Sequence, residues 1–230
     1  MMEKFQKLEK KIGIKFKNKE LLEKAFIHKS YINEHRGGHL EDNERLEFLG
    51  DAVLELIATN HLFHKYPDQN EGQMTAFRSA LVKGKHLAEV SNELGLGEYL
   101  MLSHGEEKSG GREKRYILAN IVEALIGAIY LDHGYKKAEK FIEKFILRKL
   151  DEIIDHGLHI DAKSHFQEIC QEKLGVTPHY DVIEEHGPDH NKIFIMGAYV
   201  DNELIATGKG SSKQKAEDEA AKNALTVKKW

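Results

Sequence analysis

The sequence has 230 residues, of which 40% are hydrophobic and 31% charged, and its formal net charge is −4. The one cysteine, Cys170, excludes a disulfide framework and a cysteine-based zinc site, and the negative charge counts against nucleic acid unless cations cluster locally. The N-terminus shows no secretory signal and we expect no apolar run to span a membrane, so we expect a cytoplasmic protein without a membrane partner.

The first part of the chain, from Phe5 to about Lys149, is predicted to be all-helical. Its apolar residues recur every three or four positions and are interrupted by glycines and short polar segments. The histidines in this part, such as His61 and His64, lack a third ligand at a metal-binding spacing. We therefore interpret them as solvated side chains.

The stretch 43–57 is predicted to be an amphipathic helix with an acidic side. At about 100° per residue, Glu44, Glu47 and Asp51 fall within a roughly 60° sector. The apolar residues expected on the opposite side, facing the core, are Leu46, Leu49, Val53, Leu56 and Ile57. A solvated acidic face is the simpler interpretation, but Phe48 lies on the same side as the acids. We therefore expect something to cover this face.

A basic segment with two glycines occupies residues 106–115. Its cations are Lys108, Arg112, Lys114 and Arg115. A mobile surface loop and a loop that contacts phosphate fit this composition equally well, so both interpretations stay open.

The segment 117–130 is almost entirely apolar, which predicts a buried helix. Asn120 and Glu123 interrupt it and, three residues apart, share one face. A buried, ionised Glu123 would be costly unless a cation or a hydrogen-bond donor meets it. Gly127 continues the same face without a side chain, which would let another helix come close.

The pattern changes after a predicted linker at 155–160, which separates an expected domain at 1–154 from a second at 161–230. A helix over 164–174 is followed by predicted strands at 180–185, 192–200 and 204–207 and by a last helix from Ser211. Lys209, Lys213 and Lys215 gather at the start of this last helix, where free backbone amides also attract phosphate. A plain solvated helix is the alternative.

These motifs resemble the ribonuclease III family, whose members cleave double-stranded RNA. Residues 43–54 read NERLEFLGDAVL and resemble the family signature, and residues 117–127 read ILANIVEALIG and resemble its second acidic helix. Residues 161–225 resemble the double-stranded RNA-binding domain that follows. The resemblance implies a multidomain protein, with an all-α endonuclease domain followed by a small α+β domain of order α-β-β-β-α.

The resemblance also implies a catalytic site. Glu47, Asp51 and Glu123 match the metal-binding acids, with Asp51 and Glu123 catalytic, and Asn120 stands at a metal-ligand position where the family normally has aspartate. The implied metal is Mg²⁺, with Mn²⁺ as a substitute, because carboxylates suit a hard cation. The remaining matches are the accessory acids Glu44 and Glu71 and the dimer contact Phe48, which in the family inserts into the second subunit of a homodimer.

For the second domain, the resemblance implies recognition of duplex RNA by its shape, through 2′-hydroxyls and phosphates. The residues that match RNA contacts are Ser164, Gln167, Gln171, His190, Lys213 and Gln214. Gln214 stands where the family usually has a second lysine, so we expect a modest and salt-dependent affinity from this domain.

The expected function is metal-dependent hydrolysis of double-stranded RNA to products with 5′-phosphates, in the processing of ribosomal RNA, mRNA and other RNA. Because Asn120 brings no charge, the alternative is a double-stranded RNA-binding protein with weakened or lost catalysis. The enzyme is favoured because Glu47, Asp51 and Glu123 all remain. A helical hydrolase of small phosphorylated molecules is a third, weaker interpretation.

Overall fold

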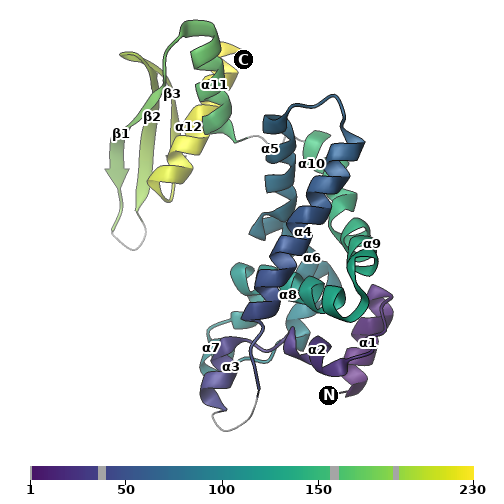
Figure 1. The fold of residues 1–230 in the computed structure, drawn as a ribbon. Coiled ribbons are helices and arrows are strands. Elements are labelled where there is room, and N and C mark those ends of the chain that lie inside the picture. The colour runs from purple at the N-terminus through teal and green to yellow at the C-terminus, as the bar shows by residue number, and fades with distance from the viewer. Residues whose placement is uncertain (1, 36–39, 156–160, 189–191) are drawn as a thin grey trace. The chain divides into compact units, whose positions relative to one another are not determined.

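The computed structural model describes residues 2–35, 40–155, 161–188 and 192–230 (Figure 1). The chain divides into two compact units, Met1–His159 and Ile160–Trp230, and each has its own hydrophobic core. The first is helical and the second combines helices with a sheet, which confirms the predicted fold class. The predicted RNA contact His190 and the linker residues 156–160 lie outside the described residues.

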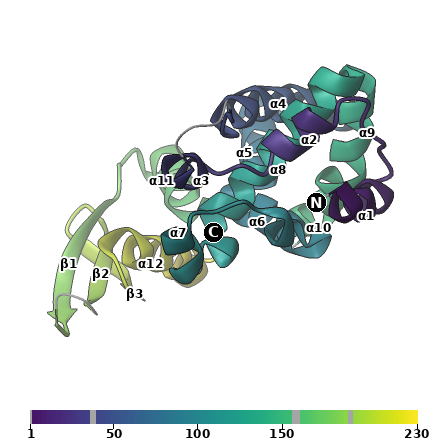
Figure 2. The ribbon, with the colours of Figure 1, turned by 90° about the horizontal axis from the view of Figure 1, so that it is seen from below.

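The helical unit is built around α8. Its α-helices are α1 (Met2–Ile12), α2 (Lys19–Lys24), α3 (Lys29–Glu34), α4 (Glu44–Lys65), α5 (Glu71–Val82), α6 (Gly84–Leu94), α7 (His104–Lys108), α8 (Arg115–His133), α9 (Tyr135–Phe145) and α10 (Leu150–Asp155). Short 3₁₀ helices span Leu96–Tyr99, Gly111–Glu113 and Leu147–Lys149. Figure 2 shows α8 between α4 and α6, and α4 is the helix against which it packs most extensively.

The apolar character of α8 corrects one expectation. By length and composition alone, this helix is apolar enough to cross a membrane. However, 61% of its most apolar stretch is buried inside the helical unit, and its middle residues Ile121, Val122 and Leu125 are fully covered. The core helix of a globular domain has the same composition, so the apolar run is explained by packing.

Caps in the sequence explain several helix ends. Asn70 accepts a hydrogen bond from the Gln73 backbone amide, and the Gln73 side chain accepts one from the Asn70 amide, so α5 begins with a capping box. Gly95 ends α6 as predicted, with a left-handed φ of 64° that glycine adopts without strain.

The second unit is a three-stranded antiparallel sheet covered by two helices. It consists of α11 (Ala162–Leu174), β1 (His179–His186), β2 (Ile193–Val200), β3 (Glu203–Gly210) and α12 (Lys213–Lys228), with strand order β1-β2-β3. The core joins Phe166 and Cys170 of α11, Ala198 of β2 and the alanines of α12. Gly208 lets α12 approach β3, since a Cβ there would lie 2.1 Å from the Ala220 nitrogen.

Candidate active site

The acids of α4 meet the polar residues of α8 where these two helices cross. A side-chain hydrogen bond joins Asn120 to Glu47, and the charges of Asp51 and Glu47 act on Glu123. The structure therefore brings together Glu47, Asp51, Asn120 and Glu123, the four residues that the resemblance implied as metal ligands. Their charges and hydrogen bonds act on one another across the crossing, while their roles as metal ligands stay predictions.

Two glycines make the close crossing of α4 and α8. A Cβ at Gly50 would lie 1.7 Å from the carbonyl oxygen of Glu123, and a Cβ at Gly127 would lie 2.2 Å from that of Leu46. No other amino acid fits at either position without moving a helix. The close approach at Gly127 was predicted from the sequence, whereas Gly50 was missed. The sequence did offer a signal for Gly50: it lies about one helical turn after Glu47, just as Gly127 lies about one turn after Glu123.

Buried contacts fix the start of α4. The side-chain amide of Asn43 donates to the Ala25 carbonyl at 3.1 Å, and its backbone amide donates to the Ile27 carbonyl at 2.9 Å. Asn43 is 3% exposed and makes no side-chain cap, so it ties α4 to the preceding segment instead. Lys29, to which the sequence assigned no role, forms an ion pair with Glu44 at 3.0 Å.

The carboxyl groups at the crossing repel one another. Burial and the charges of Asp51 and Glu47 raise the pKa of Glu123 to about 8. Burial also raises the pKa of Glu47, with Glu44 and Asp51 adding to the effect and the hydrogen bond from Asn120 opposing it. Each influence named for Glu123 disfavours its charged form. A positive charge at the crossing would relieve this repulsion.

The donor atoms at the crossing are of the type that a hard divalent cation prefers. They are the carboxylate oxygens of Glu47, Asp51 and Glu123 and the amide oxygen of Asn120, all suited to Mg²⁺ or Mn²⁺. Within the described ranges, no three His, Cys, Asp or Glu side chains lie close enough together to hold a metal ion. The donor chemistry fits a divalent cation, but the carboxyl groups have to move together to share one.

An apolar stripe runs along the exposed side of α4. Phe48 is 82% exposed, which confirms that this ring lies on the acidic side of the helix. Leu56 and Phe63 are 58% and 65% exposed and continue the stripe, and Ala52 lies between them and Phe48. The prediction that Leu56 faces the core is wrong, because at 100° per residue Leu56 lies only about 40° around the helix from the exposed Ala52, one turn earlier, and about 60° from the buried Val53.

The predicted accessory acids lie at different ends of α4. Glu44 is in its first turn, close enough to Glu47 to affect that carboxyl. Glu71 is the first residue of α5 and lines a small cavity with Phe63 and Met74 near the other end. Within one chain, Glu71 is therefore not part of the group around Glu123, and its role stays a prediction.

The basic segment 106–115 is folded rather than open. Arg112 pairs with Glu107 and donates to the carbonyls of Gly97 and Leu100 at 2.8 and 2.9 Å. Lys114 pairs with Glu106 at 2.6 Å. Two of the four cations thus hold the segment together, which disfavours the phosphate-contacting interpretation for them.

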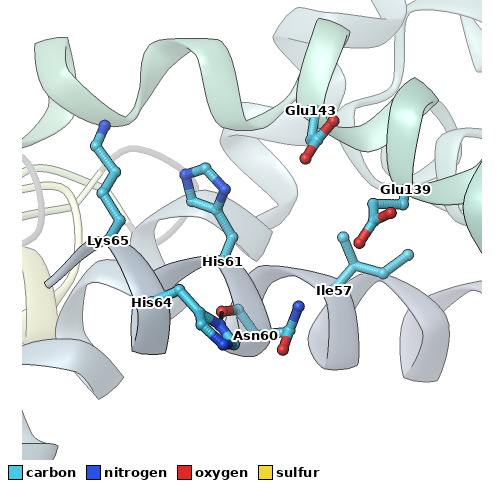
Figure 3. A pocket seen from close by; sticks show the side chains of 7 residues that line it. All are labelled: Ile57, Asn60, His61, His64, Lys65, Glu139 and Glu143. Carbon is cyan, nitrogen blue, oxygen red and sulfur yellow. Dashed lines mark hydrogen bonds between the residues drawn. The ribbon is translucent and has the colours of Figure 1, made fainter. Parts of the chain in front are cut away.

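The histidines of α4 line a cavity of about 330 Å³ against α9 (Figure 3). In Figure 3, His61 points toward Glu143, while the His64 ring lies away from it and is hydrogen-bonded to the Asn60 carbonyl at 2.8 Å. His61 is partly buried, and this burial lowers its pKa. The prediction that this histidine is a solvated side chain therefore holds only in part.

The predicted RNA contacts of the second unit lie on its surface. Ser164, Gln167 and Gln171 are exposed along one side of α11. Lys213 and Gln214 are exposed in the first turn of α12, whose N-cap Ser212 accepts a hydrogen bond from the Lys215 amide. The Lys213 ammonium lies 3.5 Å from Glu185, so its charge is partly offset.

Comparisons with known proteins cover both units. Residues 18–150 match the family model described as ribonuclease-III-like, and residues 162–228 match the double-stranded RNA binding motif. The chain is 44% identical over 227 residues to Ribonuclease 3 of Listeria innocua, covering 97% of each protein. It is 47% identical over 223 residues to Ribonuclease 3 of Geobacillus kaustophilus, covering 96% of this chain and 90% of that protein.

A solved structure also resembles the helical unit. It is the nuclease domain of ribonuclease III from Campylobacter jejuni, described as having structural flexibility in a region involved in dimer formation. The TM-score is 0.57 and the identity 42%, over 62% of this chain and 95% of that one.

Proposed function

The chain belongs to the ribonuclease III family and is an endoribonuclease of double-stranded RNA, and from this premise we propose that it hydrolyses both strands with Mg²⁺ held between α4 and α8. Family membership implies a divalent metal in general, and the choice of Mg²⁺ rests on the all-oxygen donor set. Mn²⁺, whose donor preference is similar, is the expected substitute. The observation that carries the proposal is the Glu123 carboxyl, half-buried beside Asp51 and Glu47 with its pKa raised to about 8.

The residues at the crossing have distinct tasks in this proposal. Asp51 and Glu123 hold the reacting centre from opposite helices, and Glu47 supplies a third carboxylate. A bound divalent cation would offset the charge of the scissile phosphate and lower the pKa of the attacking water. The Gly50 and Gly127 contact holds α4 against α8, so the spacing of the carboxylates is set by backbone packing rather than by flexible loops.

Asn120 fits a working enzyme in this proposal. Its amide donates to Glu47 and so favours the charged carboxylate that a cation needs. Its carbonyl oxygen remains a neutral ligand in place of the usual charged one, which lowers metal affinity without removing a donor. The alternative, a binding protein without catalysis, gains no support from the relatives, both of which are named as enzymes.

We propose further that two chains form a homodimer through the apolar stripe of α4. Phe48, Leu56 and Phe63 expose large apolar side chains along the side of α4 that also carries the acids, and exposed apolar patches mark protein contacts. The related nuclease domain from Campylobacter jejuni is described with a region involved in dimer formation. A partner over this stripe would shield Phe48 from water.

The second unit would hold the duplex by its shape. The side of α11 that carries Ser164, Gln167 and Gln171 would face a minor groove, and Lys213 would meet the phosphates. The roles proposed in the cell are processing of ribosomal RNA and mRNA, in the cytoplasm, where the free thiol of Cys170 would stay reduced.

Cleavage of a long RNA duplex tests the proposal. The wild-type protein should cut it with Mg²⁺ and not with EDTA, and Glu123→Gln should lower the rate at least about 100-fold, since even outer partners of a metal contribute 10–100-fold. Glu143→Gln makes the same chemical change at an exposed carboxyl of α9, away from the crossing of α4 and α8, and serves as the matched control. A duplex that shifts on a gel but stays intact with Mg²⁺ would refute the enzyme and favour a binding protein.

A further inference from the structure

Two adjoining cavities share lining residues in the segment after α1. The first lies between this segment and the end of α8 and start of α9, and the second lies between this segment and α1. One has a volume of about 490 Å³ and the other about 550 Å³, and Lys15 lines both. We name their lysines the lysine corner; they are Lys10, Lys15, Lys19, Lys136, Lys137 and Lys140.

The walls of the lysine corner are held in place by buried carboxylates. Asp132, at the end of α8, accepts hydrogen bonds from the backbone amides of Lys17 and Asn18 at 2.8 and 2.9 Å. Glu9 accepts one from the Phe16 amide at 2.6 Å. His133 donates to the Lys15 carbonyl at 3.1 Å. The segment that carries Lys15 is therefore fixed to α1 and α8, and its ammonium group is presented from a rigid backbone.

The neighbouring acids neutralise only part of the lysine corner. Glu9 is engaged with Lys19 and the Phe16 amide, Asp132 is engaged with backbone amides, and Glu139 pairs with Lys136 at 3.0 Å. In the part of the chain that the structure describes, the ammonium groups of Lys15, Lys137 and Lys140 form no ion pair. Positive charge thus accumulates over two concave surfaces of a protein whose overall charge is −4.

We propose that the lysine corner binds the phosphates of an RNA duplex outside the cleavage site. Lysine binds phosphate as a point charge, and several lysines around a cavity repel one another unless a polyanion joins them. Tyr135, beside the lysine corner, lies beneath the Lys136 ammonium at 5.7 Å, and the His133 ring, which lines one cavity, packs edge-on against Phe16, so neither ring is free to stack on a base. The contact is therefore with the backbone and independent of sequence.

This proposal rests on the proposed double-stranded RNA substrate and adds a second contact region to the helical unit. Glu123 and His133 are separated by about 15 Å along the axis of α8, at 1.5 Å per residue. RNA that reaches the lysine corner must therefore extend beyond the phosphate being cut. The corner should act on long substrates and leave the chemical step unchanged.

The test compares two double variants of the full chain. Lys15→Gln with Lys140→Gln removes one charge from each wall of the lysine corner. Lys7→Gln with Lys85→Gln removes two equally exposed charges that line neither cavity. Binding is measured against salt concentration for a duplex of about 16 base pairs, the length that one RNA-binding domain spans, and for one several times longer.

For the long duplex, the first variant should show a salt slope lower by about 2 and an affinity about tenfold lower at low salt, whereas the control should match the wild type. The short duplex and the maximal cleavage rate should be unaffected. Equal salt slopes for the two variants would overturn the lysine corner, and a wild type that neither binds nor cuts duplex would overturn the proposed function instead. Inorganic polyphosphate should compete for the site, and equally strong competition by polyglutamate would indicate an acidic protein partner and refute RNA.

Discussion

Removing the carboxyl charge at Glu123 should change how the stability of the helical unit depends on pH. The pKa of Glu123 is raised from an ordinary 4.5 to about 8, so between these values the folded protein holds more protons than the unfolded chain. Stability without metal should therefore fall as pH rises through this window. Glu47 acts in the same direction, because its pKa is also raised.

The size of this effect follows from the shift in pKa. Each unit corresponds to about 1.4 kcal/mol, so the upper limit for Glu123 is about 5 kcal/mol over the whole window. Glu123 is only partly buried, and water screens its neighbours. We therefore expect a loss of about 2 kcal/mol between about pH 5.5 and 8, and less than about 1 kcal/mol in Glu123→Gln.

Urea unfolding in EDTA, followed by far-UV circular dichroism, measures this loss for the helical unit. The one tryptophan, Trp230, packs on Phe166 in the second unit, so its fluorescence follows that unit separately and should show no difference between the two proteins. Burial lowers the pKa of His28, His61 and His86, which opposes the trend, but equally in both proteins.

Magnesium provides the second arm of this experiment. A cation that binds the folded state should restore the stability of the wild type at pH 8 and leave Glu123→Gln nearly unchanged. Identical pH dependence of the two proteins in EDTA would refute the reasoning, because it would show that Glu123 is charged at neutral pH without metal.

Gly50→Ala should destabilise the helical unit by about 3 kcal/mol in urea unfolding, because the new Cβ would lie 1.7 Å from the Glu123 carbonyl oxygen. The control Gly105→Ala, which has open space around it, should cause no loss of stability. Asn120→Asp should tighten Mg²⁺ binding about tenfold in calorimetry and lower the free energy of unfolding in EDTA by about 1 kcal/mol. An unchanged Mg²⁺ affinity would exclude this residue as a ligand. Phe48→Ala should weaken self-association by about 2 kcal/mol in sedimentation, whereas the exposed Leu131→Ala should not, and equal effects would argue against the stripe.

Much of the fold could be read from residue spacing. Helical periodicity predicted the first unit, and alternation along β2 predicted a strand whose Met196, Ala198 and Val200 are buried. These patterns are local, because they depend on which side of one helix or strand meets a core. Helical periodicity failed for Leu56. This residue has apolar neighbours on two sides of α4, so the spacing alone did not decide which side faces the core.

The site could be predicted only in part. The acids of α4 and the polar pair on α8 were visible as separate stripes, and only the resemblance to a family joined them. Gly50 was missed because its contact with Glu123 joins two helices that are far apart in sequence. The pairing of Arg112 and Lys114 with nearby glutamates was equally hidden, since ion pairs depend on how a loop folds back on itself.

The sequence by itself determined the helical and mixed units, the acidic stripe of α4 and the exposed place of Phe48, because periodicity and side-chain chemistry act within one element. Only the tertiary structure decided that the charges of Asp51 and Glu47 act on Glu123 and that lysines of two distant segments share one corner. Charges interact over a few ångströms through space, and the chain brings such groups together from positions far apart in sequence.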